Sequence, residues 1–364
     1  MSKDLLFQIA LTQISGIGPR TAKKLISYCG GVEAVFQASR KSLLSIPSLG
    51  RHVADLIQSA KNFDPAKREL EFIKKHQIST HFFLDKSYPQ RLKQYEDSPI
   101  LLYFKGNGNL NPGRTIGIIG TRKASPYGLA KCAELVADLV VYQPTIVSGL
   151  AYGIDIQAHR AALREKCPTI AVLGHGLDRI YPFQHKKSAL EMMEDGGLLS
   201  EFPSNTIPDR ENFPMRNRIV AAFCDALIVI ESAQTGGSLI TAEFANQYHK
   251  DVFALPGRTT DPTSSGCNFL IKTHQAALLE KATDVGYVLG WDNKPPIPVQ
   301  TSMFEDLNEE ERLVIDLLRS NEVMDFDQLA FQLQLPPSSL STLVLQLEFK
   351  GIIKSAPGNR LLLL

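Results

Sequence analysis

The fold is decided by the run Ile116-Gly117-Ile118-Ile119-Gly120-Thr121-Arg122. Its first four residues predict a short buried strand, which ends at Gly120 and is followed two residues later by the cation of Arg122. A helix is expected next, over about residues 127–141. A strand, a glycine turn and a helix in this order indicate the first unit of an α/β fold.

The same pattern recurs along the chain after this run, as far as about residue 290. Further apolar strands are expected at 145–147, 169–173, 226–230 and 252–255, with a helix near 154–164. Continuous apolar strands that alternate with helices are typical of a parallel sheet covered on both faces. We therefore predict an α/β fold in which residues 76–290 form an extended Rossmann-like domain with a parallel sheet.

Residues 1–75 have helical periodicity and contain two similar stretches, at 14–22 and 46–54. Each is a short turn followed by an amphipathic helix, although Ser48 occupies the position that Gly16 has in the first copy. We predict a small helical domain of the helix-hairpin-helix or SAM-like type, in which main-chain amides at the turns could face a DNA phosphate. A small helical bundle with ordinary turns remains the alternative.

The C-terminal part begins with a proline-rich linker at 291–303, and residues 304–364 then have the order of elements of a winged helix. This segment carries five Lys or Arg against ten Asp or Glu, a net charge of −5. Its expected recognition helix starts near Ser338-Ser339 and offers almost no cation for a DNA groove. We predict that this domain contacts protein, or packs on the rest of the chain, rather than reading DNA.

The composition limits the classes of function and the compartment. The net charge of the 364 residues is only +1, so a nucleic-acid site would need locally concentrated cations. No stretch reaches the ~18 apolar residues of a membrane span, and the N-terminus does not resemble a signal peptide. The five cysteines are scattered, which argues against a zinc site and a disulfide framework. We expect a cytoplasmic protein that does not bind membranes and holds no metal or other cofactor.

Glycines and small polar residues follow several of the predicted strands. They occur at 120–125, 148–155, 174–176 and 235–238, where the carboxyl ends of parallel strands meet at one edge. Glycine turns and helix N-termini there would form an anion site. Neither G-x-G-x-x-G nor G-x-x-x-x-G-K-[ST] is present, so a dinucleotide or nucleoside triphosphate fingerprint is missing. Arg122 and the cluster Phe213-Pro214-Met215-Arg216-Asn217-Arg218 supply guanidinium groups instead, although each arginine alone could form a surface ion pair.

Three further polar residues are expected to shape this site. Asp155 and His159 lie four apart on one helix face, and we predict a hydrogen bond between them that fixes the loop. Glu201 follows the run Leu198-Leu199-Ser200. A third ligand that would make a metal site is missing. We find no convincing nucleophile and base, although Ser148 and His159 stay open, and we expect no catalytic residues.

Together these residues resemble the DNA-processing protein A family (DprA, also called Smf). The matching blocks are 116–122 with Ser125 and Tyr127-Gly128, 148–155 with Ala158-His159, Tyr181-Pro182, Ser200-Glu201, 213–218, 237–242, Pro256-Gly257 and 266–271. They follow the family's order across about residues 85–280. Two positions depart from its common pattern, at Thr235-Gly236-Gly237-Ser238 and at Gln275-Ala276.

The resemblance implies a homodimer that binds single-stranded DNA, protects incoming DNA and loads the RecA recombinase in natural transformation. It implies no catalysis. Carried over by motif, Arg122 would hold a phosphate, and Arg216 and Arg218 would lie near the same groove. The residues expected to bind DNA or its phosphates are Gly120, Thr121, Arg122, Lys123, Ser148, Gly149, Arg216, Asn217, Arg218, Gly237 and Ser238.

Two other functions remain as alternatives to DNA binding. Nucleotide phosphoribohydrolases of the lysine-decarboxylase-like group have a related fold and the motif P-G-G-x-G-T-x-x-E. Residues 236–243 come close to it but are out of step by one residue, so Glu243 would not be presented as a general acid or base. A scaffold for protein partners, with merely structural glycine turns, would show no salt-dependent affinity for oligonucleotides.

Overall fold

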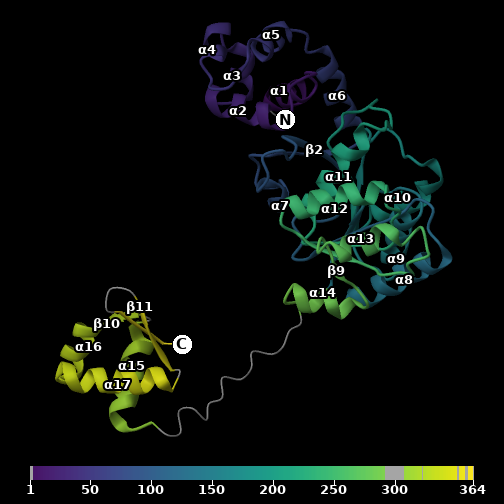
Figure 1. Ribbon diagram of the computed structural model, residues 1–364. Coiled ribbons are helices and arrows are strands. Elements are labelled where there is room, and N and C mark those ends of the chain that lie inside the picture. The colour runs from purple at the N-terminus through teal and green to yellow at the C-terminus, as the bar shows by residue number, and fades with distance from the viewer. Residues whose placement is uncertain (1–2, 292–306, 322, 351, 357–359, 364) are drawn as a thin grey trace. The chain divides into compact units, whose positions relative to one another are not determined.

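The computed structural model describes residues 3–291, 307–321, 323–350, 352–356 and 360–363. The chain divides into two compact units, Met1–Asp292 and Asn293–Leu364, and each is described by itself (Figure 1). The first unit therefore contains both the predicted helical segment and the α/β segment. Apart from Trp291, the predicted linker at 291–303 lies outside the described residues.

The first unit is built on a sheet of nine strands among its described residues. Their order across the sheet is β1-β2-β6-β5-β4-β3-β7-β8-β9. The strands are β1 (Ser79–Phe82), β2 (Leu101–Gly106), β3 (Thr115–Ile119), β4 (Thr145–Ser148), β5 (Thr169–Leu173), β6 (Gly197–Ser200), β7 (Ala226–Val229), β8 (Asp251–Ala254) and β9 (Ala277–Leu278). From β6 to β9 all pairs are parallel, which confirms the predicted parallel sheet, whereas β1 and β2 extend it antiparallel.

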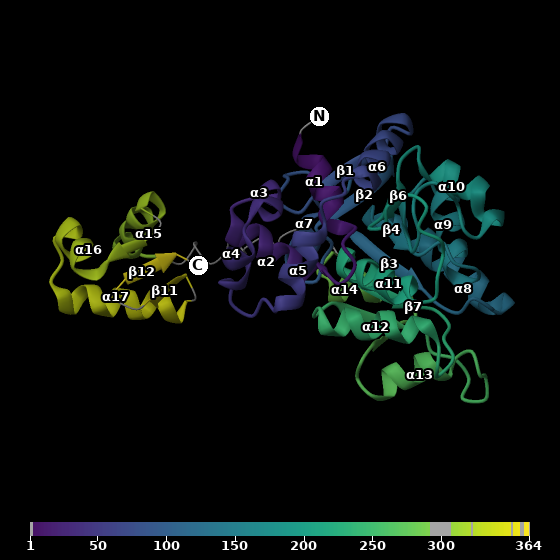
Figure 2. The same cartoon turned by 90° about the horizontal axis from the view of Figure 1, so that it is seen from above.

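Successive side chains of a strand point to opposite faces of the sheet. Helices cover both faces of this sheet and pack on these side chains. Ile116 and Ile118 of β3 pack with α8 (Pro126–Leu139) and α9 (Ile154–Arg164). On the other face, Leu227 of β7 packs with α11 (Asn212–Phe223) and α12 (Gly237–Gln247). The two sets of helices lie on opposite sides of the strands (Figure 2).

The N-terminal helices are α1 (Lys3–Thr12), α2 (Pro19–Cys29), α3 (Val32–Gln37), α4 (Arg40–Leu44), α5 (Arg51–Ser59) and α6 (Asp64–Lys75). The turns before α2 and α5 have matching geometry, because Gly16 has φ +88° and Ser48 has φ +58°. Gly18 and Gly50 then start the two helices in the same extended conformation. The two hairpins are thus structural repeats, and Ser48 adopts the left-handed conformation of the glycine that it replaces.

These helices share a hydrophobic core with the antiparallel edge of the sheet. Ile9 of α1 and Ile73 of α6 belong to the same buried cluster as Leu101 and Tyr103 of β2. Glu69 of α6 also accepts hydrogen bonds from the main-chain amide and the hydroxyl of Ser204. The helical segment is therefore anchored to the α/β segment by apolar packing and by buried polar contacts.

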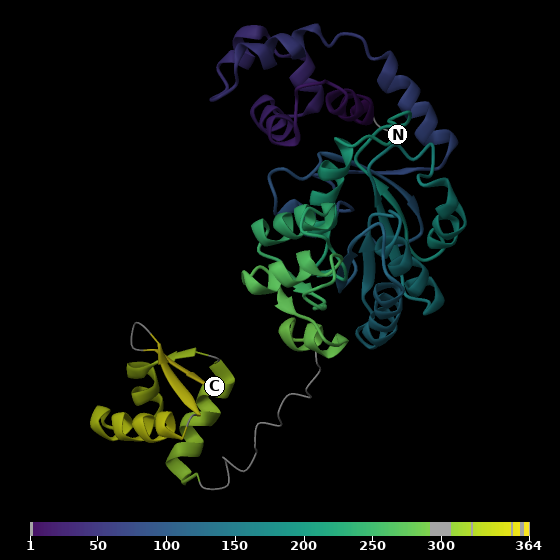
Figure 3. The ribbon, with the colours of Figure 1, turned by 45° about the vertical axis from the view of Figure 1, so that its right-hand side comes forward.

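The second unit has the predicted winged-helix order of elements (Figure 3). They are α15 (Glu309–Asn321), β10 (Val323–Asp325), α16 (Phe326–Leu333), α17 (Pro337–Phe349), β11 (Ile353–Ala356) and β12 (Arg360–Leu363). The sheet order is β10-β12-β11, with both pairs antiparallel. Strand β10 was not expected from the sequence, and the predicted turn at 357–359 lies outside the described residues.

All five cysteines are free thiols, and all but Cys29 are buried. Within the described ranges, no three His, Cys, Asp or Glu side chains come together as a metal site would require. None of the described helices has the length and apolar character needed to cross a bilayer.

Candidate nucleic-acid interface

A cavity of about 790 Å³ opens at the carboxyl ends of β3 and β7. These strands are neighbours, but α8 after β3 and α12 after β7 cover opposite faces of the sheet. Such a switch point leaves a crevice in which α/β proteins bind ligands. The lining residues are Ile119, Gly120, Thr121, Arg122, Lys123, Ala151, Asp155, Arg210, Phe213, Pro214, Arg216, Asn217, Ala233, Thr235, Gly236, Gly237, Ser238, Ile240 and Thr241. They include Gly120, Thr121, Arg122, Lys123, Arg216, Asn217, Gly237 and Ser238, which the sequence had suggested.

The turn after β3 brings two exposed cations to this cavity, Arg122 and Lys123. The main-chain amide of Thr121 donates to the carbonyl of Glu231 at 2.6 Å, which ties the turn to the end of β7. The guanidinium of Arg122 lies 5.0 Å from the centre of the Phe213 ring, a cation–π distance. Arg122 is thus held at the cavity while its donors stay accessible.

The N-terminus of α12 forms the opposite wall. Its N-cap residue, Gly236, provides no side-chain cap, and the first amides of a helix lack intrahelical partners. No atom lies within 4 Å of where a Cβ of Gly237 would stand, so the main chain is open to a ligand there. The hydroxyl of Ser238 donates to Ser232 Oγ at 2.7 Å and shapes the loop. This wall therefore offers amide donors and the positive end of a helix dipole.

Arg216 is a buried cation at the base of the cavity, with only 4% of its surface exposed. Its Nη1 donates to the carbonyl of Val172 at 2.8 Å. Burial lowers the pKa of Arg216, and the nearby Asp155 carboxylate opposes that shift. Gly149 makes room for this side chain, because a Cβ there would lie 1.7 Å from Nη1. Arg216 thus adds positive potential to the cavity from below its surface.

Ser148 and Gly149 are not among the residues that line the cavity. The hydroxyl of Ser148 is buried and donates to the carbonyl of Ile118 at 2.6 Å, so it joins β4 to β3. Gly149 instead lines an adjoining small recess together with Arg122 and Arg216. Both residues therefore support the site from beneath.

Arg218 and Glu201 lie away from the cavity, contrary to the expectation that Arg218 would be close to the same groove. They form a buried ion pair with each other, and Arg218 also donates to the main-chain carbonyl of Asp97. The physical reason is helical geometry, since residues two apart on a helix do not share a face. Arg216 therefore points to the cavity and Arg218 to the interior near β2.

The predicted hydrogen bond between Asp155 and His159 is absent. His159 is fully buried, and its Nδ1 lies 2.7 Å from Thr169 Oγ1 on the neighbouring strand. Asp155 fixes the loop by itself, since its carboxylate accepts a hydrogen bond from the amide of Ala151 at 3.4 Å. Burial raises the pKa of Asp155, and Arg216 opposes this shift. The four-residue spacing places the two side chains on one face of α9, but His159 pairs with Thr169 and Asp155 with the amide of Ala151.

Arg210 also lines the cavity, although no motif in the sequence pointed to it. It is exposed and lies in the segment before α11, three residues ahead of Phe213. Among the residues lining the cavity, the cations are Arg122, Lys123, Arg210 and Arg216, and the only carboxylate is Asp155. The charges that line the cavity therefore favour an anion.

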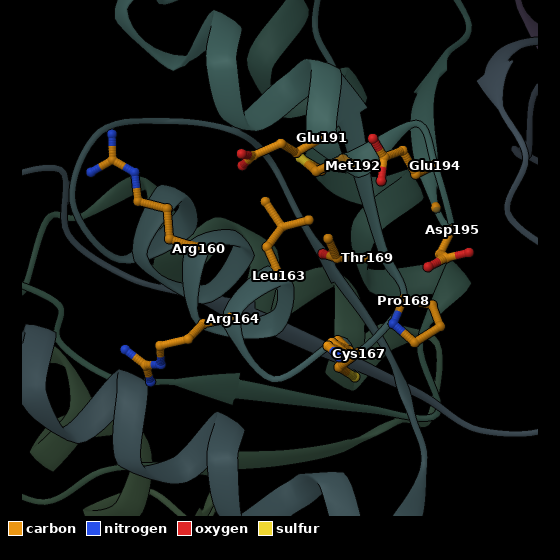
Figure 4. A pocket seen from close by; sticks show the side chains of 12 residues that line it. Arg160, Leu163, Arg164, Cys167, Pro168, Thr169, Glu191, Met192, Glu194 and Asp195 are labelled. Carbon is orange, nitrogen blue, oxygen red and sulfur yellow. The ribbon is translucent and has the colours of Figure 1, made fainter.

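A second open groove, of about 650 Å³, lies at the amino ends of β5 and β6. Figure 4 shows Arg160 and Arg164 on one side of it and Glu194 and Asp195 on the other. Cations and carboxylates thus line it together. A polyanion would meet both attraction and repulsion there, so this groove is not a candidate for binding nucleic acid.

Comparison with known proteins decides the family. The family model described as DNA recombination-mediator protein A matches residues 79–289, which is more than half of the chain. The chain belongs to the DNA recombination-mediator protein A family. Two further models match in the flanking segments, the SAM-like helix-hairpin-helix tandem at 8–60 and the DprA winged helix domain at 301–359. The resemblance drawn from the sequence motifs is thereby confirmed.

Individual members of the DNA recombination-mediator protein A family are similar over most of the chain. Protein Smf of Synechocystis is 30% identical, covering 97% of both chains. The DNA processing protein DprA of Streptococcus pneumoniae is 40% identical over 65% of this chain and 82% of its own.

Two solved structures of the family are similar as well. The X-ray structure of the S. pneumoniae protein has a TM-score of 0.67 at 33% identity and covers 77% of this chain and 96% of its own. DNA processing protein A from Helicobacter pylori, whose structure is described as revealing a unique single-stranded DNA binding mode, has a TM-score of 0.54 at 32% identity. It covers 59% of this chain and 97% of its own.

Proposed function

We propose that this protein binds single-stranded DNA by holding its sugar-phosphate backbone in the cavity between β3 and α12. The observation that carries the proposal is the convergence of four cations and an uncapped helix N-terminus on one cavity with a single carboxylate. Guanidinium groups and free amides are the donors that phosphate oxygens require. The description of the H. pylori relative as a single-stranded DNA binding protein supports this choice of anion.

The sugar-phosphate backbone is the same for every sequence, so binding in this cavity is sequence-tolerant. Arg122, Lys123 and Arg210 are the exposed contacts, with the amides of Gly237 and Ser238 opposite. Arg216 acts from below through its field, since its guanidinium is buried and its Nη1 donates to the carbonyl of Val172. Arg218 has no part in the proposed contact because its charge is paired with Glu201.

A salt titration of the full chain with a labelled single strand tests this proposal. The log–log slope of affinity against salt is about −0.7 per phosphate neutralised. Arg122→Ala should weaken binding by roughly tenfold for all sequences and make the slope shallower by about 0.7. Arg160→Ala removes an exposed cation from the mixed-charge groove and is the matched control. Equal losses in the two variants, or a loss confined to particular bases, would overturn the proposal.

We also propose that the protein acts as a homodimer in the cytoplasm, where it protects incoming DNA and loads RecA during transformation. Membership in a family of DNA recombination mediators supports the link to RecA. The parallel edge strand β9 supports self-association, because Leu278 on it and Phe269 on α13 (Ser265–Lys272) leave apolar surface exposed. Leu278→Glu should convert dimer to monomer in light scattering and slow RecA filament growth on a coated strand.

The phosphoribohydrolase alternative is less well supported by the same geometry. Glu243, its candidate acid or base, is exposed on α12 and is not among the residues lining the cavity. It accepts a hydrogen bond from Gln247 at 3.4 Å on its own helix. We therefore propose binding without catalysis, and base release from a nucleoside monophosphate that Glu243→Gln abolishes would reverse this choice.

A further inference from the structure

Two exposed tyrosines, Tyr152 and Tyr181, lie beside the proposed phosphate site, and the exposed Phe183 follows Tyr181 by two residues along the chain. Tyr152 is 43% exposed, Tyr181 is 49% exposed and Phe183 is 71% exposed. Single exposed apolar residues are ordinary, but exposed aromatic residues next to a cationic cavity are not. Tyr152 and Tyr181 also line the small recess that Arg122 and Arg216 share with them. The aromatic surface is therefore continuous with the cationic one.

The ring of Tyr152 is held in place by its neighbours. The hydroxyl of Tyr152 donates to Gln184 Oε1 at 3.0 Å, and its ring meets the His185 ring edge-on, with centroids 5.0 Å apart. His185 is in turn buried, with Nδ1 2.8 Å from the Leu150 carbonyl. A ring fixed in this way loses little conformational entropy when a ligand stacks on it.

A cation accompanies this aromatic group. The ammonium of Lys186 lies 5.5 Å from the centre of the Phe183 ring, and Lys186 is exposed. Phe213, the other aromatic residue near the cavity, differs because the guanidinium of Arg122 covers its ring. Phe213 lines the same recess as Tyr152 and Tyr181, but its ring already has Arg122 over it, so the free aromatic faces there are those of the two tyrosines.

We propose that Tyr152, Tyr181 and Phe183 form a stacking platform for the bases of the strand whose backbone the cavity holds. This inference rests on the proposed function and deepens it. Unpaired bases expose their flat faces, and each can stack on an aromatic ring whatever its identity. A duplex keeps those faces covered within its own stack. The platform therefore gives a preference for single strands over duplexes that the phosphate contacts alone do not supply.

A comparison of normal and abasic strands tests the platform. The full chain and its Tyr181→Ala/Phe183→Ala variant are titrated with an oligothymidylate and with an abasic strand of the same length. The variant should bind the oligothymidylate at least tenfold more weakly, because each stacked base contributes to affinity. Its affinity for the abasic strand and its salt slope should stay unchanged. Tyr181→Trp/Phe183→Trp should restore binding to the oligothymidylate.

Two further variants separate the possible results. Tyr28→Ala removes an exposed tyrosine from α2 and should have no effect on either strand. Arg122→Ala should weaken binding to both strands alike. If Arg122→Ala has this effect and the aromatic variant binds both strands as the parent does, the platform is wrong and the proposed function stands. Equal losses of the aromatic variant on both strands would also overturn the platform. If the parent chain binds neither strand, both proposals fail.

Discussion

Single side chains of the same type have different roles in this site, and burial decides between them. Arg122 is exposed beside the cavity, Arg216 lies buried beneath it, and Arg218 is paired with Glu201 in the interior. The motif predicted that guanidinium groups would gather at the carboxyl edge of the sheet. The motif did not distinguish the role of Arg216 from that of Arg218, because these roles depend on which face of α11 meets the sheet. Arg210 was missed because no glycine turn or predicted element marks its position.

The burial of His159 makes the free energy of unfolding depend on pH. Burial lowers its pKa from 6.5 to about 3 in the folded chain. Between these values the unfolded chain binds more protons, so the free energy of unfolding falls as the pH drops below 6.5. The expected loss from His159 is about 2 kcal/mol between pH 7 and pH 5.

Urea unfolding of the full chain and of His159→Gln at both pH values measures this contribution. His175 and His185 are also buried with lowered pKa values and are present in both proteins. The variant should therefore lose less stability on acidification than the parent. The same pH dependence in both proteins would show that His159 is not the buried neutral group described here.

Among the elements, strands with an uninterrupted apolar run were predictable, whereas a strand that begins at a glycine and one of only two residues were not. The run at β3 has five buried residues, and its pattern reveals it directly. Strand β6 begins at Gly197, where a Cβ would come within 2.5 Å of the Phe104 ring, so close packing and not side-chain pattern defines it. Strand β9 has only two residues. Both strands depend on pairing with distant partners, which a local pattern does not contain.

The two N-terminal hairpins allow a paired test of an element. Ser48 is held at φ +58°, a conformation that costs a side-chain-bearing residue of order 1 kcal/mol. Ser48→Gly should therefore raise the free energy of unfolding by about 0.5 kcal/mol. Gly16→Ala should lower it by about 1 kcal/mol, since Gly16 has φ +88° and a Cβ would lie 3.1 Å from Leu56 Cδ1. Thermal unfolding measures both, and a lower melting temperature for Ser48→Gly would contradict the equivalence of the turns.

In the whole molecule, the proposed DNA site is built by residues of the first unit alone. Every residue that lines the cavity lies within Met1–Asp292. Residues 304–364 carry a net charge of −5, and the exposed side chains of α17 include Leu345 and Phe349. These features favour contact with protein over contact with DNA. The role of this unit could not be derived further from the sequence, because the wing and helix alone do not specify a partner.

Removal of residues 293–364 tests this division of roles. The shortened chain retains one compact unit, so its affinity for a single strand should stay within about twofold of the parent. Anisotropy titrations at two salt concentrations measure the affinity and its salt slope. A large loss of affinity, or tight binding of duplex DNA by residues 304–364 alone at physiological salt, would assign a DNA contact to the second unit.

A crystal structure of the full chain with a short oligothymidylate tests the central claim most directly. We predict phosphate oxygens at hydrogen-bond distance, about 3 Å, from the Arg122 guanidinium and from the main-chain amide of Gly237 or Ser238. The claim would be contradicted if the cavity between β3 and α12 were empty and the strand lay elsewhere. Such places are the mixed-charge groove at the amino ends of β5 and β6, which α9 and α10 (Lys186–Met192) flank, and the second unit.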